Sequence, residues 1–191
     1  MVVLLGSLTG TDGNPKMKCF FPSPKQERQY FRGKLRLRCS SKDQERDHDF
    51  YSFTLLGSGQ RSKNAFQVHM LQNRKWIEDK DVPDNLLDFR AVMQIHMARA
   101  INEDRADGPV LFVCPTGVHR CGTFAVLNIL SDRLKEEKKV GLDETLAIVR
   151  SQRYGVVAHF DHYKVLHELT VRQAVSFGMV DTSAVGGGRR R

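Results

Sequence analysis

The stretch from residue 110 to residue 134 limits the possible folds more than any other part of the sequence. It opens with four apolar residues in a row, 110–113 (Val-Leu-Phe-Val), a pattern typical of a central strand covered on both faces. Apolar residues then recur at helical spacing, at Phe124, Leu127, Leu130 and Leu134. A short polar loop joins the two segments. A buried strand that leads through a loop into an amphipathic helix predicts a fold of the α/β or α+β class.

The remaining hydrophobic patterns add further strands and helices. The apolar residues 2–5 predict a buried strand, and alternating or aromatic-rich stretches predict a mostly antiparallel, half-exposed group of strands at 34–39, 50–56 and 65–71. Helical spacing predicts helices at 86–101, 142–152 and 161–174, the first with a methionine-bearing stripe that faces the core. We therefore predict a mixed, twisted sheet flanked by helices in one domain over residues 1–175. Residues 176–191 are glycine-rich and end in three arginines, which predicts a disordered tail.

Charge and composition exclude several classes of protein. The 191 residues carry a formal net charge of +8, and residues 16–46 hold ten Lys or Arg side chains against three acidic ones. This basic stretch contains no nucleic-acid-binding motif, so we interpret it as a solvated face and expect no nucleic-acid partner. No apolar run reaches the roughly 18 residues of a membrane-spanning helix, so no membrane span is predicted. Four scattered cysteines fit no disulfide framework, which favours free thiols in a reducing, cytoplasmic compartment.

The loop after the apolar run carries the residues best suited to chemistry. Cys114 and Arg120 stand six positions apart (Cys-Pro-Thr-Gly-Val-His-Arg), with Gly117 between them. A backbone that curls at the start of a helix directs its N–H groups at an anion, and this positive end favours the thiolate form of a nearby cysteine. An arginine can form two hydrogen bonds to one phosphoryl group. We interpret the loop as a phosphate cradle with a nucleophile; the alternative is a buried structural cysteine and a surface arginine.

With these residues, the sequence resembles the classical protein-tyrosine phosphatase family, whose signature is His-Cys, five residues, Arg, then Ser or Thr and Gly. Further stretches resemble the family in order and spacing, and they lie at 18–22, 76–83, 108–114, 122–124, 149–153 and 161–163. The resemblance covers residues 2–175 and implies the fold of that family. The family's N-terminal helices and phosphotyrosine-recognition loop have no counterpart before Val2. We therefore expect that part of the family domain to be absent. A partner protein is a candidate to cover the surface that its absence would expose.

The resemblance implies a role for each residue of the loop. Cys114 would be the nucleophile that forms a cysteinyl-phosphate, and Arg120 would hold the transferred phosphoryl group. The substrate phosphate would bind to Thr116, Gly117, Val118, His119 and Arg120. The implied substrate is a phosphotyrosine-containing protein, and the implied chemistry uses no metal and no cofactor.

The same resemblance implies a general acid in residues 76–83 (Trp-Ile-Glu-Asp-Lys-Asp-Val-Pro), a degenerate form of the family's Trp-Pro-Asp loop. Counting back from the end of this stretch selects Asp79, counting forward from Trp76 selects Glu78, and Asp81 is close by. We predict that Asp79 is the acid. The alternative is a solvated acidic turn next to a tryptophan that packs in the core or at a hinge.

Several positions depart from the family pattern, and each departure changes a group that the family uses. They are Val113 for the signature histidine, Pro115 (which has no N–H), His119 for a glycine, Cys121 for Ser or Thr, and Ala158 and His162 for two glutamines.

Two hypotheses about function follow from the resemblance and from these departures. One is a phosphatase that works through Cys114, Asp79 and Arg120. The other is a pseudophosphatase that binds phosphoproteins or acts as a scaffold with little or no turnover.

Overall fold

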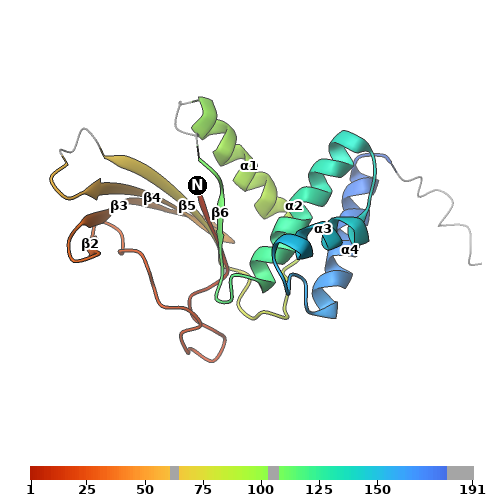
Figure 1. Ribbon diagram of the computed structural model, residues 1–191, viewed down its shortest axis with the longest axis horizontal. Helices are drawn as coiled ribbons and strands as arrows, with labels where there is room; N and C mark the ends of the chain where they lie inside the picture. The colour runs from red at the N-terminus through yellow and green to blue at the C-terminus, as the bar shows by residue number, and fades with distance from the viewer. Residues whose placement is uncertain (61–64, 103–107, 180–191) are drawn as a thin grey trace, which may run out of the picture. The chain divides into compact units, whose positions relative to one another are not determined.

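The computed structural model describes residues 1–60, 65–102 and 108–179, and the chain divides into two compact units, Met1–Gly117 and Val118–Arg191 (Figure 1). We call them the N-terminal unit and the C-terminal unit. Within the described ranges, no helix is long and apolar enough to cross a membrane. The last helix continues through Ser176, and residues 180–191 of the predicted tail lie outside the described ranges. The assignment of residues 1–175 to one domain stays a prediction.

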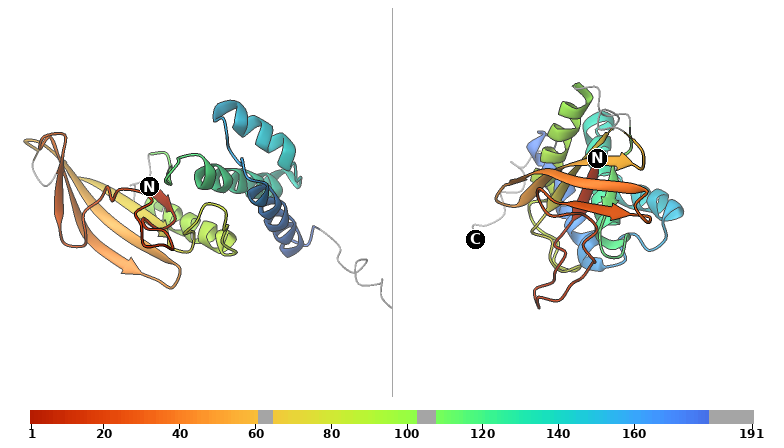
Figure 2. Two further views of the ribbon diagram at one scale, coloured as in Figure 1. Left: turned by 90° about the horizontal axis from the view of Figure 1, so that it is seen from below. Right: turned by 90° about the vertical axis from the view of Figure 1, so that its left-hand side faces the viewer.

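A six-stranded mixed sheet forms the centre of the N-terminal unit and, with the helices, confirms the predicted α+β class. Its strands are β1 (Val2–Leu5), β2 (Glu27–Tyr30), β3 (Leu35–Gln44), β4 (His48–Gly57), β5 (Phe66–Asn73) and β6 (Leu111–Val113), in the order β2-β3-β4-β5-β1-β6. Strands β2 to β5 pair antiparallel, whereas β1 pairs parallel with both β5 and β6. Figure 2 shows the long strands β3 and β4 twisting together.

Two strands differ from the expectation. The prediction that residues 110–113 form a central strand is wrong: in the part of the chain that the structure describes, β6 pairs only with β1 at the edge of the sheet, and Leu111 is 59% exposed. A short apolar run does not tell a central strand from an edge strand, because hydrophobicity carries no information about a second neighbour. Strand β2 escapes prediction because its residues are polar, and it forms by backbone pairing with β3.

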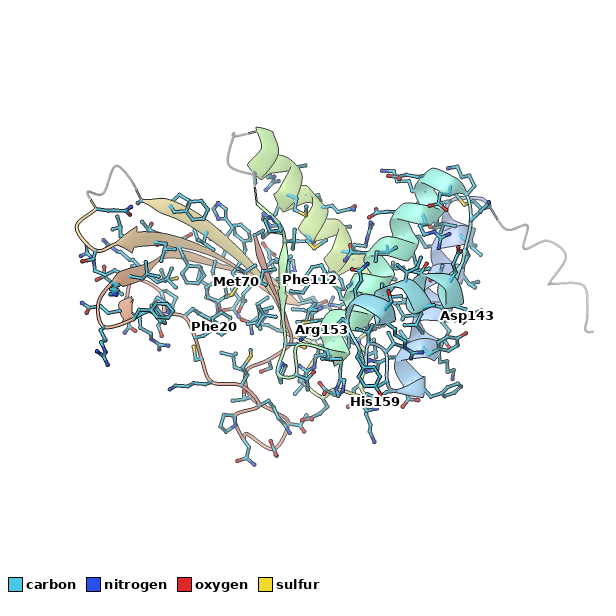
Figure 3. The ribbon with its side chains drawn as sticks, viewed as in Figure 1. Phe20, Met70, Phe112, Asp143, Arg153 and His159 are labelled. Carbon is cyan, nitrogen blue, oxygen red and sulfur yellow. The ribbon has the colours of Figure 1, made fainter. Side chains whose placement is uncertain are left out.

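One face of the sheet is covered by an aromatic cluster. Phe21, from the segment before β2, packs against Tyr51 and Phe53 of β4, with ring centroids 5.3 and 5.9 Å apart. The buried members that complete the cluster are Leu4, Cys39 and Met70. Figure 3 labels Met70. Residues 51 and 53 alternate with residue 50 along β4, so Phe50 lies on the opposite face.

Helix α1 (Leu86–Asn102) packs on that opposite face. The ring of Phe50 stacks on the ring of His96 from α1, with centroids 3.9 Å apart. The predicted stripe of α1 is buried at Leu86, Phe89 and Met93 and half-buried at Met97. The side chain of Ile101, the last member of the stripe, lies outside the described residues. The described part of the stripe thus packs inward, as its spacing predicts.

A buried carboxylate on β4 is held by two cations and a phenol. Asp49 is 2% exposed, and its oxygens lie 3.0 Å from Nζ of Lys42 and 3.2 Å from Nε of Arg74. The hydroxyl of Tyr51 donates to Asp49 at 3.3 Å. Burial, followed by the negative charge of Asp49, raises the pKa of Tyr51, so this hydroxyl keeps its proton. The charge of Asp49 is stable in the interior because these partners replace water.

Asp49→Asn is expected to lower the free energy of unfolding by about 2 kcal/mol, because Lys42 and Arg74 then share a partly buried site without a counter-charge. Urea unfolding followed by circular dichroism measures this change. Asp43→Asn is the matched control, since Asp43 lies exposed on the neighbouring strand β3. This control is expected to change stability by less than about 0.5 kcal/mol. Equal effects of the two substitutions would contradict a stabilising role for the ion pairs.

Three helices make up the described part of the C-terminal unit: α2 (His119–Glu137), α3 (Leu142–Gln152) and α4 (Phe160–Ser176). Helix α2 packs against both α3 and α4. Its apolar stripe at 124, 127, 130 and 134 is fully buried, as its spacing predicts. The guanidinium of Arg133 ties α2 to α3, because it donates to the Thr145 hydroxyl at 2.8 Å and to the Glu144 carboxylate at 3.0 Å. Helices α3 and α4 match the predicted helices to within two residues at each end.

Candidate active site

The chain turns sharply directly after β6, at Cys114. The N–H of Gly117 donates to the carbonyl oxygen of Cys114 at 3.2 Å, which closes a turn. Gly117 has a φ of +66°, in the left-handed region that favours glycine. The side chain of Cys114 is buried, and the hydroxyl oxygen of Thr116 lies 3.8 Å from its Sγ. The turn therefore places a hydroxyl beside the thiol.

The second half of the loop runs into the first turn of α2, in the C-terminal unit. Helix α2 begins at His119, with Val118 as its N-cap, which is earlier than the helical spacing predicts. Arg120 is therefore a helical residue, and it is only 2% exposed. The alternative interpretation of a surface arginine is wrong. Cys121, which follows Arg120, is also buried.

The predicted site residues are divided between the two units. Asp79, Cys114, Thr116 and Gly117 belong to the N-terminal unit, and Val118, His119 and Arg120 belong to the C-terminal unit. Thr116 is exposed, whereas Gly117, Val118 and His119 are half-buried. Five residues of the loop separate Cys114 from Arg120, so the candidate nucleophile and the candidate phosphate-binding arginine are close in the sequence.

A buried chain of hydrogen bonds fixes the first turn of α2. The hydroxyl of Thr123 donates to the carbonyl oxygen of His119 at 2.9 Å and lies 2.8 Å from Nδ1 of His162. The single proton of the Thr123 hydroxyl is donated to the His119 carbonyl. We therefore place a proton on Nδ1 of His162, which donates a hydrogen bond to the Thr123 oxygen. Thr123 and His162 are both completely buried. This pair ties the start of α4 to the start of α2.

The segment before α4, residues 153–159, packs closely against α2. A Cβ at Gly122 would lie 2.7 Å from a methyl carbon of Val156, so the approach requires a glycine. From α3, Arg150 donates to the carbonyl oxygens of Val156 and Val157 at 3.0 and 2.9 Å. Val157 has a φ of +56°, a strained value for a β-branched residue. Arg150 thus holds the segment in a conformation that its own sequence disfavours.

Three imidazole rings gather beside the first turn of α2. The ring of His159 lies edge-to-face against the rings of His119 and His162, with centroids 4.8 and 5.4 Å away. Figure 3 labels His159 at the beginning of α4. The spacing of His159 and His162 is visible in the sequence, but the contact with His119 is tertiary and carries no local sequence signal. Nowhere in the described ranges do three or more His, Cys, Asp or Glu residues form a group that could hold a metal ion.

In the N-terminal unit, the acidic segment 76–83 follows β5 and is anchored by Trp76. The Trp76 side chain is completely buried. Its backbone N–H donates to Oδ1 of Asn73 at 3.3 Å, and its carbonyl oxygen accepts from the N–H of Ser7 at 3.2 Å. Trp76 is thus a core residue that fixes the start of the segment.

The three candidate acids in this segment have different surroundings. Glu78 accepts hydrogen bonds from the N–H and the hydroxyl of Thr11, at 3.1 and 3.2 Å, and lies 3.4 Å from Nζ of Lys16. These contacts, the backbone hydrogen bond from Thr11 most of all, hold the pKa of Glu78 below its ordinary value. Asp79 is half-buried, and Asp81 is exposed. Glu78 is therefore an ionised residue that braces the neighbouring loop.

Gly122→Ala tests the close approach of α2 and the 153–159 segment. The added methyl would overlap the side chain of Val156, so we expect a loss of about 1–3 kcal/mol in the free energy of unfolding, against the small gain that alanine normally brings to a helix. Chemical denaturation measures the loss. Gly108→Ala serves as the control, because its Cβ would meet no atom within 4 Å. A Gly122→Ala protein as stable as the parent would show that the contact imposes no constraint.

Comparison with known proteins agrees with the signature loop. A profile described as protein-tyrosine phosphatase matches residues 1–172. The chain is 26% identical over 164 residues to the tyrosine-protein phosphatase corkscrew of Drosophila melanogaster, covering 81% of this chain and 18% of that protein. It is 30% identical over 133 residues to the receptor-type tyrosine-protein phosphatase S of Gallus gallus, covering 70% of this chain and 8% of that protein. The chain thus spans less than a fifth of the length of these relatives.

The match runs through the acidic segment, the turn at Cys114, the first turn of α2 and most of α4. The residues that carry the candidate chemistry therefore all lie inside the matched range. The chain belongs to the protein-tyrosine phosphatase family.

Proposed function

We propose that this chain hydrolyses phosphotyrosine in proteins through a cysteinyl-phosphate on Cys114. The observation that carries the proposal is the loop from Cys114 to Arg120, which begins with a buried thiol and ends with a buried guanidinium. A guanidinium can form two hydrogen bonds to one phosphoryl group, so an arginine at the end of this loop suits an anionic ligand. The four cysteines are free thiols, which suits a reducing, cytoplasmic setting for a thiolate nucleophile.

In the proposed first step, the thiolate of Cys114 attacks phosphorus and the bond from phosphorus to the tyrosyl oxygen breaks. Arg120 holds two oxygens of the transferred group, and the N–H groups of Thr116, Val118 and His119 contribute further donors. Pro115 offers no N–H. A general acid protonates the leaving phenolate oxygen, so that tyrosine departs as a neutral phenol.

We assign the general acid to Asp79. An acid must carry a proton when the substrate binds, and Glu78 fails this requirement because Thr11 and Lys16 stabilise its ionised form. Between the two remaining candidates, Asp79 is half-buried and Asp81 is exposed. The position of Asp79 in the segment, counted back from Pro83, supports the same residue.

A second candidate function is a pseudophosphatase that binds phosphoproteins without turnover. The observation that favours it is Cys121, whose buried thiol takes the place of the family's Ser or Thr hydroxyl and is a weak donor to the departing thiolate. Ala158 points in the same direction, because a methyl group replaces a glutamine of the family. Both substitutions affect release of phosphate from Cys114 more than its capture.

Hydrolysis of a phosphotyrosyl peptide by the whole chain, folded as judged by a cooperative thermal melt, tests the proposal. Cys114→Ser is expected to lower turnover by about 10³-fold or more, because the nucleophile is lost. Cys19→Ser is the matched control, since Cys19 is exposed and lies outside the loop. Peptide binding by the parent protein without turnover would replace the phosphatase proposal with the pseudophosphatase.

Three carboxyl variants test the assignment of the acid. Asp79→Asn is expected to lower kcat by about 10²-fold for a phosphotyrosyl peptide and less for an aryl phosphate whose leaving group needs no proton. Glu78→Gln and Asp81→Asn are expected to stay within about tenfold of the parent. If Asp81→Asn instead shows the leaving-group-dependent loss, the acid is Asp81 and the assignment is wrong.

A further inference from the structure

The hairpin formed by β2 and β3 concentrates positive charge at one edge of the sheet in the N-terminal unit. Residues 28–38 include five cationic side chains and no acidic one. Four of the five are exposed, and Arg36 is half-buried. Among the described residues, none of the five forms an ion pair with a carboxylate. The five are Arg28, Arg32, Lys34, Arg36 and Arg38. Their charge is therefore available to an anionic ligand from solution.

An exposed aromatic ring lies in the turn of this hairpin. Phe31 is 74% exposed. Together with Leu35, Arg32 and Lys34, it lines an open hollow of about 610 Å³. Two apolar side chains and two cations thus share one surface. Exposure of a phenyl ring to water is unfavourable, and a ligand that covers the ring would remove that cost. The mixture suits a ligand that is both anionic and apolar.

The backbone of the turn is strained at two adjacent residues. Phe31 has a φ of +51° and Arg32 a φ of +56°, both in the left-handed region. Turns of this kind are usually made with Gly, Asn or Asp, which adopt positive φ at low cost. The Phe31 side chain returns little of the cost through packing, because most of it is exposed. Strained, exposed residues of this kind are typical of sites that bind something else.

Neighbouring segments hold the hairpin in place. The N–H of Ser58, at the end of β4, donates to the carbonyl oxygen of Lys34 at 2.7 Å. The guanidinium of Arg28 donates to the carbonyl oxygen of Cys19 at 2.7 Å, and the hydroxyl of Tyr30 donates to that of Phe20. Figure 1 shows β2 as the outermost strand of the sheet, and no strand of the described structure pairs with its other edge. The turn is thus presented to solvent in a fixed shape, which lowers the entropy lost on binding.

We propose that the turn of the β2–β3 hairpin docks on an anionic lipid surface. The ring of Phe31 enters the boundary between headgroups and acyl chains, where aromatic side chains are favoured. Arg32 and Lys34 flank the ring and contact lipid phosphates and carboxylates, as basic residues do at anionic membranes. Arg28 and Arg36 lie within about 10 Å of the turn, because a strand rises about 3.3 Å per residue. This inference does not depend on the phosphatase proposal.

The hollow favours a lipid surface over an acidic protein. It is open, and its apolar side chains lie beside its cations, which matches the acyl chain and the charged headgroup of a single lipid class. An acidic protein would satisfy the cations but would need its own apolar pocket to cover Phe31. A bilayer covers an apolar ring at any place where it inserts.

Sedimentation of the whole chain with vesicles tests the proposal. Binding is expected with phosphatidylcholine vesicles that contain 30% phosphatidylserine and not with phosphatidylcholine alone, and it is expected to weaken when NaCl is raised from 0.1 to 0.5 M. Phe31→Ala is expected to lower the partition coefficient about 5- to 20-fold. The double variant Arg32→Gln/Lys34→Gln is expected to lower it about 10- to 30-fold, because each cation near an anionic surface contributes a factor of about five.

Each variant has a matched control. Phe160→Ala removes an aromatic ring of similar exposure, 76%, from the C-terminal unit. Lys80→Gln/Arg99→Gln removes one lysine and one arginine that are exposed elsewhere in the N-terminal unit. Both controls are expected to bind within about twofold of the parent. A cooperative thermal melt of each variant shows that it is folded.

Fluorescence measures insertion of the turn directly. The chain has one tryptophan, Trp76, which is completely buried. Phe31→Trp places a second one in the turn. Its emission is expected to shift to shorter wavelength when phosphatidylserine vesicles are added, because the indole ring leaves water. The emission of the parent protein is expected to stay unchanged.

Three results would overturn the proposal. They are absence of vesicle binding by the folded parent, vesicle binding that Phe31→Ala leaves unchanged, and equal losses in the controls and the hairpin variants. If the parent ignores vesicles but binds poly-glutamate through Arg32 and Lys34, the hairpin is a site for an acidic protein instead. Hydrolysis of a phosphotyrosyl peptide is measured separately, so failure of this inference leaves the phosphatase proposal standing.

Discussion

Thr123 places a hydroxyl in the interior of the C-terminal unit, where each hydrogen-bonding group needs a partner. It meets this requirement twice, with the carbonyl of His119 in its own helix and with the imidazole of His162 at the start of another. Removal of the Thr123 hydroxyl would break both hydrogen bonds, at a cost of about 1–3 kcal/mol. Arg120 lies within the helical turn that this hydroxyl closes, so the guanidinium is carried by a backbone segment that a buried side chain holds in place.

Much of the fold can be predicted from periodicity, and the failures have a common cause. Helix α3 matches its predicted range because its apolar spacing and flanking glycine are local features. The edge position of β6 is not local, since it depends on which strand lies beside β1. Strand β2 has no hydrophobic pattern and is held by backbone pairing with β3, which is not a local feature. Local patterns thus predict the elements well and their neighbours poorly.

The same distinction holds for the candidate site. Cys114 and Arg120 are recognised by their spacing, and a strand and a helix that flank them support that interpretation. The role of Glu78 depends on Thr11 and Lys16, which belong to an irregular loop distant in the sequence. Nothing in the acidic segment itself separates Glu78 from Asp79. Likewise, the contact between His119 and His159 follows from the packing of α2 and α4, so nothing in the sequence connects the two histidines.

The strained backbone at Val157 limits which amino-acid substitutions this chain can accept during evolution. A β-branched residue in the left-handed region costs about 1–3 kcal/mol, and the two hydrogen bonds from Arg150 offset that cost. The two positions are therefore coupled. A lineage that loses Arg150 is expected to acquire glycine or asparagine at position 157, whereas one that keeps the arginine remains free to keep valine. Residues 150 and 157 are then expected to covary, because the hydrogen bonds from the arginine offset the backbone strain at the valine.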